Sequence, residues 1–259
     1  MAVRVVPLGS GSHGNATLVE FGPTRVLVEA GLSARTLARR LEGAGVAPGS
    51  LAAVLVSHEH QDHAFGAERF SKVFGVPLAC TVETLEALDL SPLHLARWVA
   101  VEPGRLLEID GVEVDAFPVP HDAARPVGFS LRGEGIRVGI VTDLGHATTL
   151  VVERLRGCHV LMVEANHDDR MLLAGPYPWH LKQRIGGRMG HLSNEEAALL
   201  IERVAEPDCR AVILTHLSEK NNTPALARDA SARALQRAGR KRVEMRVAAA
   251  TRPSVPVVL

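Results

Sequence analysis

The segment from His58 to His63 has the sequence His-Glu-His-Gln-Asp-His and directly follows the apolar run Ala52 to Val56. Residues two apart in an extended segment project to the same side, so His58 and His60 can bind one metal ion. Asp62 and His63 come next, at the start of an expected helix, where they can bind a second ion about 4 Å from the first. The alternative is a solvated turn in which Asp62 only caps that helix. The spacing predicts a hydrolytic site with two metal ions.

Further ligands are needed, because four residues cannot complete two metal sites. Three candidates each come directly after an apolar run: His121, Asp143 and His216. Taken alone, each is as easily a cap or a buried polar residue with a hydrogen-bond partner. Their repeated position favours the metal hypothesis, and the Asp143 carboxylate can bridge two cations. Nitrogen and oxygen ligands of this kind fit Mn²⁺ or Zn²⁺.

The overall composition limits the classes of partner. The 259 residues include 29 Lys and Arg against 29 Asp and Glu, so no global field attracts nucleic acid or anionic lipid. Any site for a polyanion must therefore be local. Cys80, Cys158 and Cys209 form no CxxC pair, which indicates buried thiols in a reducing compartment. The sequence shows neither a secretory leader nor a run of about 18 apolar residues, which predicts a cytoplasmic protein without a membrane span. It indicates no particular oligomeric state.

Apolar strands and amphipathic helices are expected to position these side chains. The strands expected in the first sheet are Val3 to Leu8, Thr17 to Phe21, Arg25 to Glu29, Ala52 to Val56 and Pro77 to Cys80. A second sheet is expected to begin with Trp98 to Val101, Arg105 to Ile109, Val112 to Val119, Val127 to Leu131 and Ile136 to Val141. The last third is expected to add the strands Val160 to Val163, Ala211 to Thr215 and Arg242 to Val247.

The expected helices are Thr36 to Leu41, Ala64 to Phe74, Glu83 to Leu88, Thr148 to Leu155, Asn194 to Val204 and Ala225 to Ala238. No long linker, low-complexity tract or repeat of fixed period interrupts the chain. We therefore expect one domain over residues 1–259. Its fold class is α/β (α+β), a four-layer αββα sandwich with the helices outside two facing sheets.

The order of these motifs, His-x-His-x-Asp-His, a later His, an Asp and a final His, resembles the metallo-β-lactamase superfamily over nearly the whole chain. The resemblance implies the metallo-β-lactamase fold and two divalent metal ions per chain. It implies His58, His60 and His121 on the first metal, Asp62, His63 and His216 on the second, and Asp143 between them.

A downstream region resembles RNase Z-type nucleases. It runs from Gly190 to Ala197 and continues, after a helix, at Ile213 to Ser218. In those nucleases a His of this segment pairs with a Glu, and the matching residues here are His191 and Glu164. Such a pair can donate a proton to the leaving oxygen of a phosphodiester. The alternative is that His191 helps to cap the helix that follows. The resemblance implies three catalytic residues, Asp62, Glu164 and His191.

Six separated segments resemble the YycJ (WalJ) family: Gly9 to Asn15, Pro120 to Ala123, Thr142 to His146, Glu164 to Asp168, Gly175 to Trp179 and Leu217 to Asn222. That family lacks the inserted β-CASP domain of RNase J and is associated with 5′-to-3′ DNA exonuclease activity and mismatch repair in bacteria. The resemblance implies a binuclear metal-dependent phosphodiesterase whose partner is DNA with a 5′-phosphate.

Three alternatives stay open at this point. The first is a small-molecule hydrolase on the same fold, acting on a thioester, lactone or phosphodiester metabolite, which the neutral net charge favours slightly. The second is an RNA nuclease. The third is a binding module with a vestigial metal site, against which the complete ligand set argues.

Substrate contacts are expected in two places. Tyr177 and Trp179 adjoin Lys182 and Arg184, and rings interleaved with cations suit a nucleic-acid end. The alternative there is an aromatic loop anchor beside a solvated basic face. In the Gly-rich loop before Thr17, the candidates for positioning substrate or ordering the metal loop are Ser10, Ser12 and Asn15.

Other polar residues are expected to play supporting parts. His13, His146 and His167 lie near the site by sequence logic and are expected to support ligands rather than to bind metal. The basic cluster around the last helix is expected to be a solvated face rather than a DNA track. Its members are Arg233, Arg237, Arg240, Lys241 and Arg242.

Overall fold

The computed structural model describes residues 2–259 and contains two seven-stranded sheets. The strands of the first sheet are β1 (Val3–Gly9), β2 (Ala16–Phe21), β3 (Thr24–Val28), β4 (Ala53–Leu55), β5 (Leu78–Cys80), β6 (Trp98–Ala100) and β14 (Val257–Val258). Those of the second are β7 (Leu106–Ile109), β8 (Val112–Pro118), β9 (Val127–Gly133), β10 (Ile136–Val141), β11 (Val160–Glu164), β12 (Ala211–Thr215) and β13 (Glu244–Val247). Their orders are β14-β1-β2-β3-β4-β5-β6 and β13-β12-β11-β10-β9-β8-β7.

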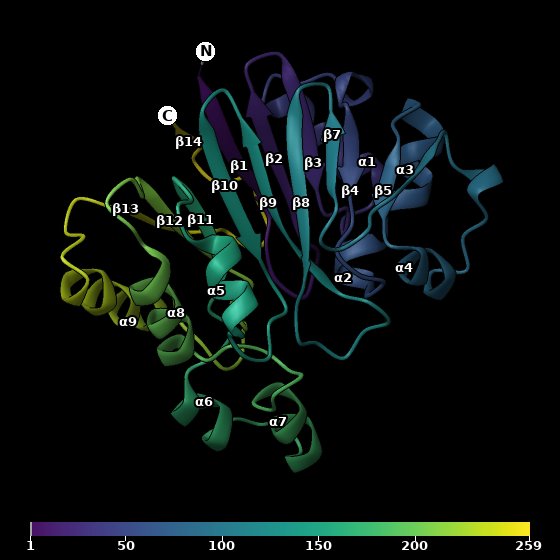
Figure 1. Ribbon diagram of the computed structural model, residues 1–259. Coiled ribbons are helices and arrows are strands. Elements are labelled where there is room, and N and C mark those ends of the chain that lie inside the picture. Colours follow the sequence, from purple (N-terminus) through teal and green to yellow (C-terminus); the bar gives the residue numbers. More distant parts are fainter. Residues whose placement is uncertain (1) are drawn as a thin grey trace.

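Helices cover the outer sides of both sheets (Figure 1). The helices beside the first sheet are α1 (Ala34–Gly43), α2 (Gln61–Ala64), α3 (Ala67–Phe74) and α4 (Val82–Ala87), with the short turns η1 (Pro48–Ser50) and η2 (Pro92–His94). Later in the chain come α5 (Thr149–Leu155), α6 (Asp169–Ala174), α7 (Trp179–Ile185), α8 (Asn194–Val204) and α9 (Pro224–Arg237). The expected four-layer αββα sandwich is confirmed.

The strands appear in the sequence as continuous runs of apolar residues because both faces of each sheet are buried. In β1, Val5 packs between the two sheets, whereas its neighbour Val6 packs outward with Leu37 of α1. In β11, Met162 points inward and Leu161 points toward α5 and α8. Successive residues of a strand point to opposite faces, so a strand covered on both sides is apolar at every position. This pattern also explains why the strands that end at the site were found from the sequence.

Two expectations about the elements were wrong, and three elements were not predicted. The strand near Trp98 was assigned to the second sheet, but β6 pairs in parallel with β5 of the first sheet, with Leu78 opposite Trp98. A strand that follows a crossover helix returns beside its predecessor, and α4 makes this crossover. The expected helix Ala64 to Phe74 is divided into α2 and α3. The division falls at Gly66, where a Cβ would lie 2.1 Å from the Leu32 carbonyl oxygen. Helices α6 and α7 and strand β14 were not predicted.

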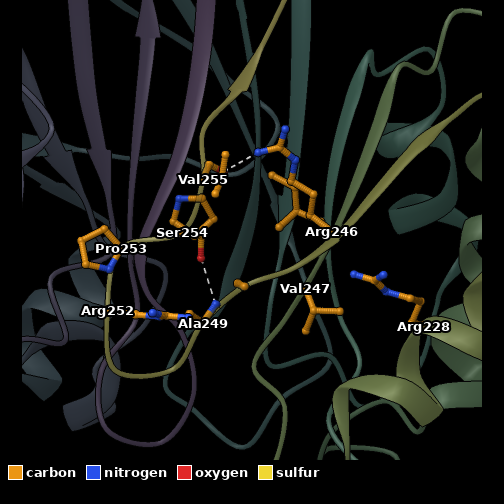
Figure 2. A pocket seen from close by; sticks show the side chains of 11 residues that line it. Arg228, Arg246, Val247, Ala249, Arg252, Pro253, Ser254 and Val255 are labelled. Carbon is orange, nitrogen blue, oxygen red and sulfur yellow. Dashed lines mark hydrogen bonds between the residues drawn. The ribbon is translucent and has the colours of Figure 1, made fainter.

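The C-terminal segment after β13 crosses from the second sheet to the first and closes one edge of the sandwich (Figure 2). Ala249 N–H donates to the Ser254 hydroxyl at 2.9 Å. Arg246 donates from Nη1 to the carbonyl oxygens of Val255 at 2.7 Å and Pro256 at 2.6 Å. Ser254 N–H donates to the Pro7 carbonyl of β1. Hydrogen bonds from side chains thus hold the segment before β14, because a strand as short as β14 forms few backbone hydrogen bonds.

The three cysteines are buried, as expected. Among residues 2–259, no helix combines the length and the apolar character required to cross a bilayer.

Arg246→Ala is expected to lower the free energy of unfolding by about 1–2 kcal/mol, because two backbone carbonyls lose a charged donor. Urea denaturation followed by circular dichroism measures this change. The matched control is Arg252→Ala in the same segment, since Arg252 is exposed and no ion pair or hydrogen bond of its side chain occurs in the described chain. Equal losses for the two variants would contradict this role of Arg246.

Candidate metal centre

Five of the seven expected metal ligands lie just beyond the carboxyl end of a strand, and the other two, Asp62 and His63, lie in α2. His58 and His60 follow β4, His121 follows β8, Asp143 follows β10 and His216 follows β12. These ends meet at one edge of the two sheets, so ligands that are far apart in the sequence become neighbours. Two groups of these residues have ligand atoms within 4.8 Å of one another. One group is His58, His60 and His121, and the other is Asp62, His63, Asp143 and His216.

The first group consists of three imidazoles with converging nitrogens. His60 Nδ1 lies 3.1 Å from His58 Nε2 and 3.3 Å from His121 Nε2. The other nitrogen of His121, Nδ1, lies 3.0 Å from the Gly190 carbonyl, which can only accept, so Nδ1 carries the hydrogen. Burial, and next the neighbouring His63, lowers the pKa of His58. The His58 imidazole is therefore in the neutral form that binds metals.

The second group combines carboxylates with imidazoles. His216 Nε2 lies 3.1 Å from Asp62 Oδ2, and His63 Nε2 lies 2.8 Å from Asp143 Oδ2. His216 Nδ1 is turned the other way, 3.1 Å from Glu164 Oε1. His216 thus has one nitrogen held by a protein acceptor and the other directed at the centre, an arrangement typical of histidines that bind metal.

Asp143 lies between the two groups. Its Oδ2 is beside His63, and its Oδ1 is 3.8 Å from His121 Nε2 of the first group. The side chain is buried, and Oδ2 has no hydrogen-bond partner among the described residues, despite the 2.8 Å approach of His63. A buried carboxylate oxygen without a partner is costly unless a cation compensates it. The donor set and this oxygen both fit a pair of divalent metal ions.

The backbone is left-handed at three residues around this centre. Glu29, Asp143 and His216 have φ angles of 68°, 55° and 54°. Glu29 and His216 come directly after a strand, and Asp143 is the second residue after β10. Residues with a side chain rarely adopt this conformation, which costs of the order of 1 kcal/mol or more. The side chains of these residues lie together at the ends of the strands. The strained backbone conformation therefore occurs at residues whose side chains contribute to the centre.

The metal loop is held by backbone contacts with two other segments. Asn15 N–H donates to the Asp62 carbonyl at 2.7 Å, and Ala30 N–H donates to the His63 carbonyl at 2.8 Å. Gly31 packs so closely on Asp62 that a Cβ there would lie 1.7 Å from the Asp62 carbonyl oxygen. Only glycine fits such an approach of two backbones.

Glu164 and His191 form the pair expected from the sequence. Glu164 is fully buried at the end of β11, and its Oε1 lies 2.7 Å from His191 Nδ1. Its Oε2 accepts from the backbone N–H of Leu144 at 2.9 Å and of Leu192 at 3.3 Å. Burial alone would raise the pKa of Glu164, but His191 and His216 lower it to about 2. Burial alone would lower the pKa of His191, but the charge of Glu164 raises it. The contact between them therefore favours the ionised carboxylate of Glu164 and the protonated form of His191.

Two supporting residues were missed in the sequence. Glu29 is buried after β3, with Oε2 3.4 Å from His63 Nδ1 and 3.3 Å from Ser57 N, from which it accepts a hydrogen bond. Asn166 donates from Nδ2 to the His216 carbonyl at 3.0 Å. Glu29 occupies the same position after a strand as the ligands do, so the strand-end argument could have found it. Nothing in the sequence distinguishes Asn166.

The Gly-rich loop candidates differ in their surroundings. Ser10 is buried and its hydroxyl accepts from His216 N–H at 2.7 Å. The Asn15 side-chain amide lies 3.0 Å from His63 Nε2 and donates to Asp62. Ser12 is exposed. Of the two roles considered for this loop, ordering of the metal ligands is the one that these contacts support for Ser10 and Asn15.

The aromatic and basic candidates for substrate contact do not form a single group in the structure. Trp179 is 63% exposed at the start of α7, and Lys182 donates to the Leu173 carbonyl of α6 at 2.7 Å. Arg184 is instead paired with Asp122, at 2.5 Å between Nε and Oδ2. Tyr177 is half-buried before α7. Trp179 and Lys182 line one cavity, whose described lining includes neither Arg184 nor Tyr177.

The basic cluster at the last helix is exposed and partly neutralised. Arg233 pairs with Glu195 at 2.8 Å and Arg237 with Glu202 at 2.6 Å, both across to α8. Arg240 donates to the Ala205 carbonyl. Paired cations offer little to a polyanion, so the expectation of a solvated face rather than a DNA track agrees with this geometry.

Comparison with known proteins places this arrangement in a family. The family described as beta-lactamase superfamily domain matches residues 24–217. The exodeoxyribonuclease YycJ of Bacillus anthracis is 30% identical over 241 residues, covering 92% of this chain and 91% of that protein. The exodeoxyribonuclease WalJ of Streptococcus pneumoniae serotype 2 (strain D39) is 31% identical over 224 residues, covering 85% and 83% of the two chains.

A solved structure has the same fold. The metallo-beta-lactamase fold protein YhfI of Bacillus subtilis superposes with a TM-score of 0.77 over 100% of both chains, at 15% sequence identity. At this identity the likeness concerns the fold alone. The family match and the sequence relatives carry the assignment. The chain belongs to the metallo-β-lactamase superfamily, in which it is a metal-dependent hydrolase of the YycJ/WalJ type.

Proposed function

We propose that this chain is a binuclear metal-dependent phosphodiesterase that removes nucleotides stepwise from the 5′ end of DNA. The observation that carries the proposal is the buried Glu164–His191 pair beside two groups of metal-ligating residues. A sugar oxygen departs from a phosphodiester more readily when it gains a proton, and His191 held by Glu164 can supply that proton. The names of the relatives support DNA as the polymer.

Seven residues would hold the two cations. His58, His60 and His121 form one site, Asp62, His63 and His216 form the other, and Asp143 lies between them. When bound, two divalent cations would lower the pKa of a water molecule and polarise the phosphorus centre. The donors are nitrogen and oxygen, which fits Mn²⁺ or Zn²⁺. Among the ligands, Asp62 is the partly exposed carboxylate, so it is the one that can also contact substrate.

His191 supplies the proton in this proposal. Its Nδ1 is held by Glu164, which leaves Nε2 as the group that can reach the departing oxygen. Glu164 is itself fixed by two backbone N–H groups, so it orients the imidazole and stabilises its positive charge. His191 stacks on His216 with ring centroids 5.3 Å apart, which places the donor directly beside the second metal site.

A metabolite phosphodiesterase is the second candidate. The zero net charge and the pairing of Arg233 and Arg237 with glutamates leave no broad basic surface on α9 for a polymer. The same centre would serve a small phosphodiester or RNA, since the ligands and the proton donor recognise the bond rather than the chain around it. The substrates in the following experiment separate these possibilities.

The Mn²⁺-loaded protein is expected to shorten 3′-labelled DNA stepwise from a 5′-phosphorylated end, because cleavage requires both cations and His191. The measurement uses single- and double-stranded DNA and RNA, with and without the 5′-phosphate, resolved on sequencing gels. Asp143→Ala is the inactive control, since it removes the carboxylate between the two metal sites. Cleavage of RNA alone, or of no polymer, would refute the DNA proposal.

His191→Ala is expected to lower kcat on a DNA phosphodiester by about 10²- to 10⁴-fold, because the leaving sugar oxygen loses its proton donor. On a nitrophenyl phosphodiester, whose leaving group departs without a proton, the loss is expected to be about tenfold or less. Steady-state kinetics on both substrates give the two ratios. Equal losses on both substrates would show that His191 acts on metal binding or folding instead.

Elemental analysis of metal-replete protein is expected to give two metal ions per chain. Asp62→Ala and His58→Ala are each expected to lose about one equivalent, because they belong to different groups. Fewer than two ions in the wild type would revive the hypothesis of a vestigial site. A variant at His13, which is exposed and outside both groups, serves as the control and is expected to keep both ions.

A further inference from the structure

A cavity of about 420 Å³ lies between α6 and α7, the two helices that extend beyond the strand ends in Figure 1. Its lining includes His167, Asp169, Leu172, Leu173, Trp179 and Lys182. Volumes of this size are typical of sites for small molecules or single groups of a larger ligand. Neither helix was predicted from the sequence, so the cavity was unforeseen as well.

One wall of the cavity is apolar and exposed. Trp179 is 63% exposed and Leu173 is 62% exposed. Trp179 is one of only two tryptophans in the chain, and such a large apolar ring is rarely left in water on a small protein. The flat face of an indole offers a stacking surface for another planar ring.

A buried polar atom belongs to the same lining. His167 is only 1% exposed, and its Nδ1 has no hydrogen-bond partner among residues 2–259. A buried nitrogen without a hydrogen-bond partner is destabilising unless a ligand or water completes it. The expectation that His167 supports a metal ligand is not met by any contact of its ring with those ligands in the described chain. His167 instead belongs to the lining of the cavity, and the nitrogen nearest to other lining residues is Nε2, 3.8 Å from Asp169 Oδ1.

The charges in the cavity favour a neutral ring over a phosphate. Asp169 contributes a carboxylate that would repel an anion and can accept from an exocyclic amino group. Lys182 donates one N–H to the Leu173 carbonyl, and its other N–H groups can donate to a ring oxygen or nitrogen. A planar ring with both donors and acceptors at its edge matches this wall of Trp179, His167, Asp169 and Lys182. Nucleobases have this chemistry.

The cavity adjoins the proton donor of the metal centre. The backbone N–H of His191 donates to the carbonyl of Ile185, the last residue of α7, at 2.8 Å. His167 forms a parallel bridge with Ser193, and Asn194 N–H donates to the His167 carbonyl at 2.8 Å. The segment that presents His191 is therefore hydrogen-bonded to α7 and to the backbone of His167, which both contribute to the lining of the cavity. A group bound there belongs to the nucleotide next to the bond that is cut.

We propose that this cavity binds the base of the terminal nucleotide, stacked on Trp179 and contacted at its edge by His167. The proposal rests on the proposed phosphodiesterase function and assigns it a recognition site. Stacking accepts any base, so the cavity would position the end of a strand without selecting its sequence. Metal ligands would hold the phosphate and the cavity the base, which together fix the scissile bond.

The test pairs protein variants with a substrate that lacks the base. Wild type, Trp179→Ala and Trp179→Phe cleave a 5′-phosphorylated oligonucleotide that carries either a normal or an abasic terminal nucleotide. On the normal end, Trp179→Ala is expected to raise KM about tenfold or more, and Trp179→Phe is expected to recover most of this loss. On the abasic end, all three proteins are expected to have the same KM. Leu93→Ala, at an exposed apolar residue of η2, is the matched control and is expected to behave as wild type.

Two outcomes would overturn the proposal. One is an equal rise in KM on both ends for Trp179→Ala, which shows that the ring contacts something other than the base. The other is no rise on either end. His167→Ala is expected to raise KM on the normal end only, as Trp179→Ala does, and an unchanged KM would remove His167 from the site.

A second measurement does not depend on cleavage. Trp98→Phe leaves Trp179 as the sole tryptophan, and its fluorescence is expected to be quenched by the oligonucleotide with a chelator present, but not by the abasic one. Quenching without any cleavage of nucleic acid by the metal-loaded wild type would contradict the proposed function while upholding base binding. Cleavage without base-dependent quenching would uphold the function and reject the cavity as its base site.

Discussion

Burial of negative charge is the constraint on which the centre depends. Asp143, Glu164 and Glu29 are buried, and the carboxylate of Asp62 is largely enclosed beside them. Burial alone would raise the pKa of Asp143, yet His216 and His63 hold it well below its usual range. Ionised carboxylates can share this space only if positive charge lies among them. Protonated imidazoles supply it without metal, and divalent cations would supply more of it while the imidazoles become neutral ligands.

This charge balance explains why so many residues without a direct chemical role surround the ligands. The Gly190 carbonyl fixes one ring nitrogen of His121 and thereby the direction of the other. Glu29 Oε2 lies 3.4 Å from His63 Nδ1, and Asn166 holds the backbone carbonyl of His216. Glu164 serves two imidazoles through one oxygen, since His216 and His191 both approach Oε1. The proton donor and a metal ligand therefore share a carboxylate, which couples the two parts of the site electrostatically.

The fold and most of the ligand set could be predicted because strand ends and ligand spacing are local in the sequence. Apolar runs identified the strands, and the residue after each run identified His121, Asp143 and His216. Their positions relative to one another confirm the two groups as neighbours, although their roles as metal ligands stay a proposal. The family resemblance, rather than spacing, indicated His191 and Glu164.

What could not be predicted depends on contacts between distant segments. The pairing of Arg184 with Asp122 joins residues 62 positions apart and removes a cation that the sequence offers to substrate. Which of the two sheets β6 joins depends on the direction of the crossover from β5. Amino-acid composition does not indicate that direction. Helices α6 and α7 have only 6 and 7 residues, too few for a helical period to stand out between proline and glycine. The cavity between these helices forms only when they pack in the folded chain, and no sequence motif indicates it.

The contact of Gly31 with Asp62 has a consequence for how the protein acquires its metal. The ligand loop is fixed by main-chain hydrogen bonds from Asn15 and Ala30 and by a close backbone approach, none of which involves the ligand side chains. The scaffold can therefore fold first and load later. A preformed site of this kind would accept any suitable ion that is available, since geometry alone discriminates weakly among first-row metals. The identity of the working ion is then a property of cellular metal supply as much as of the chain.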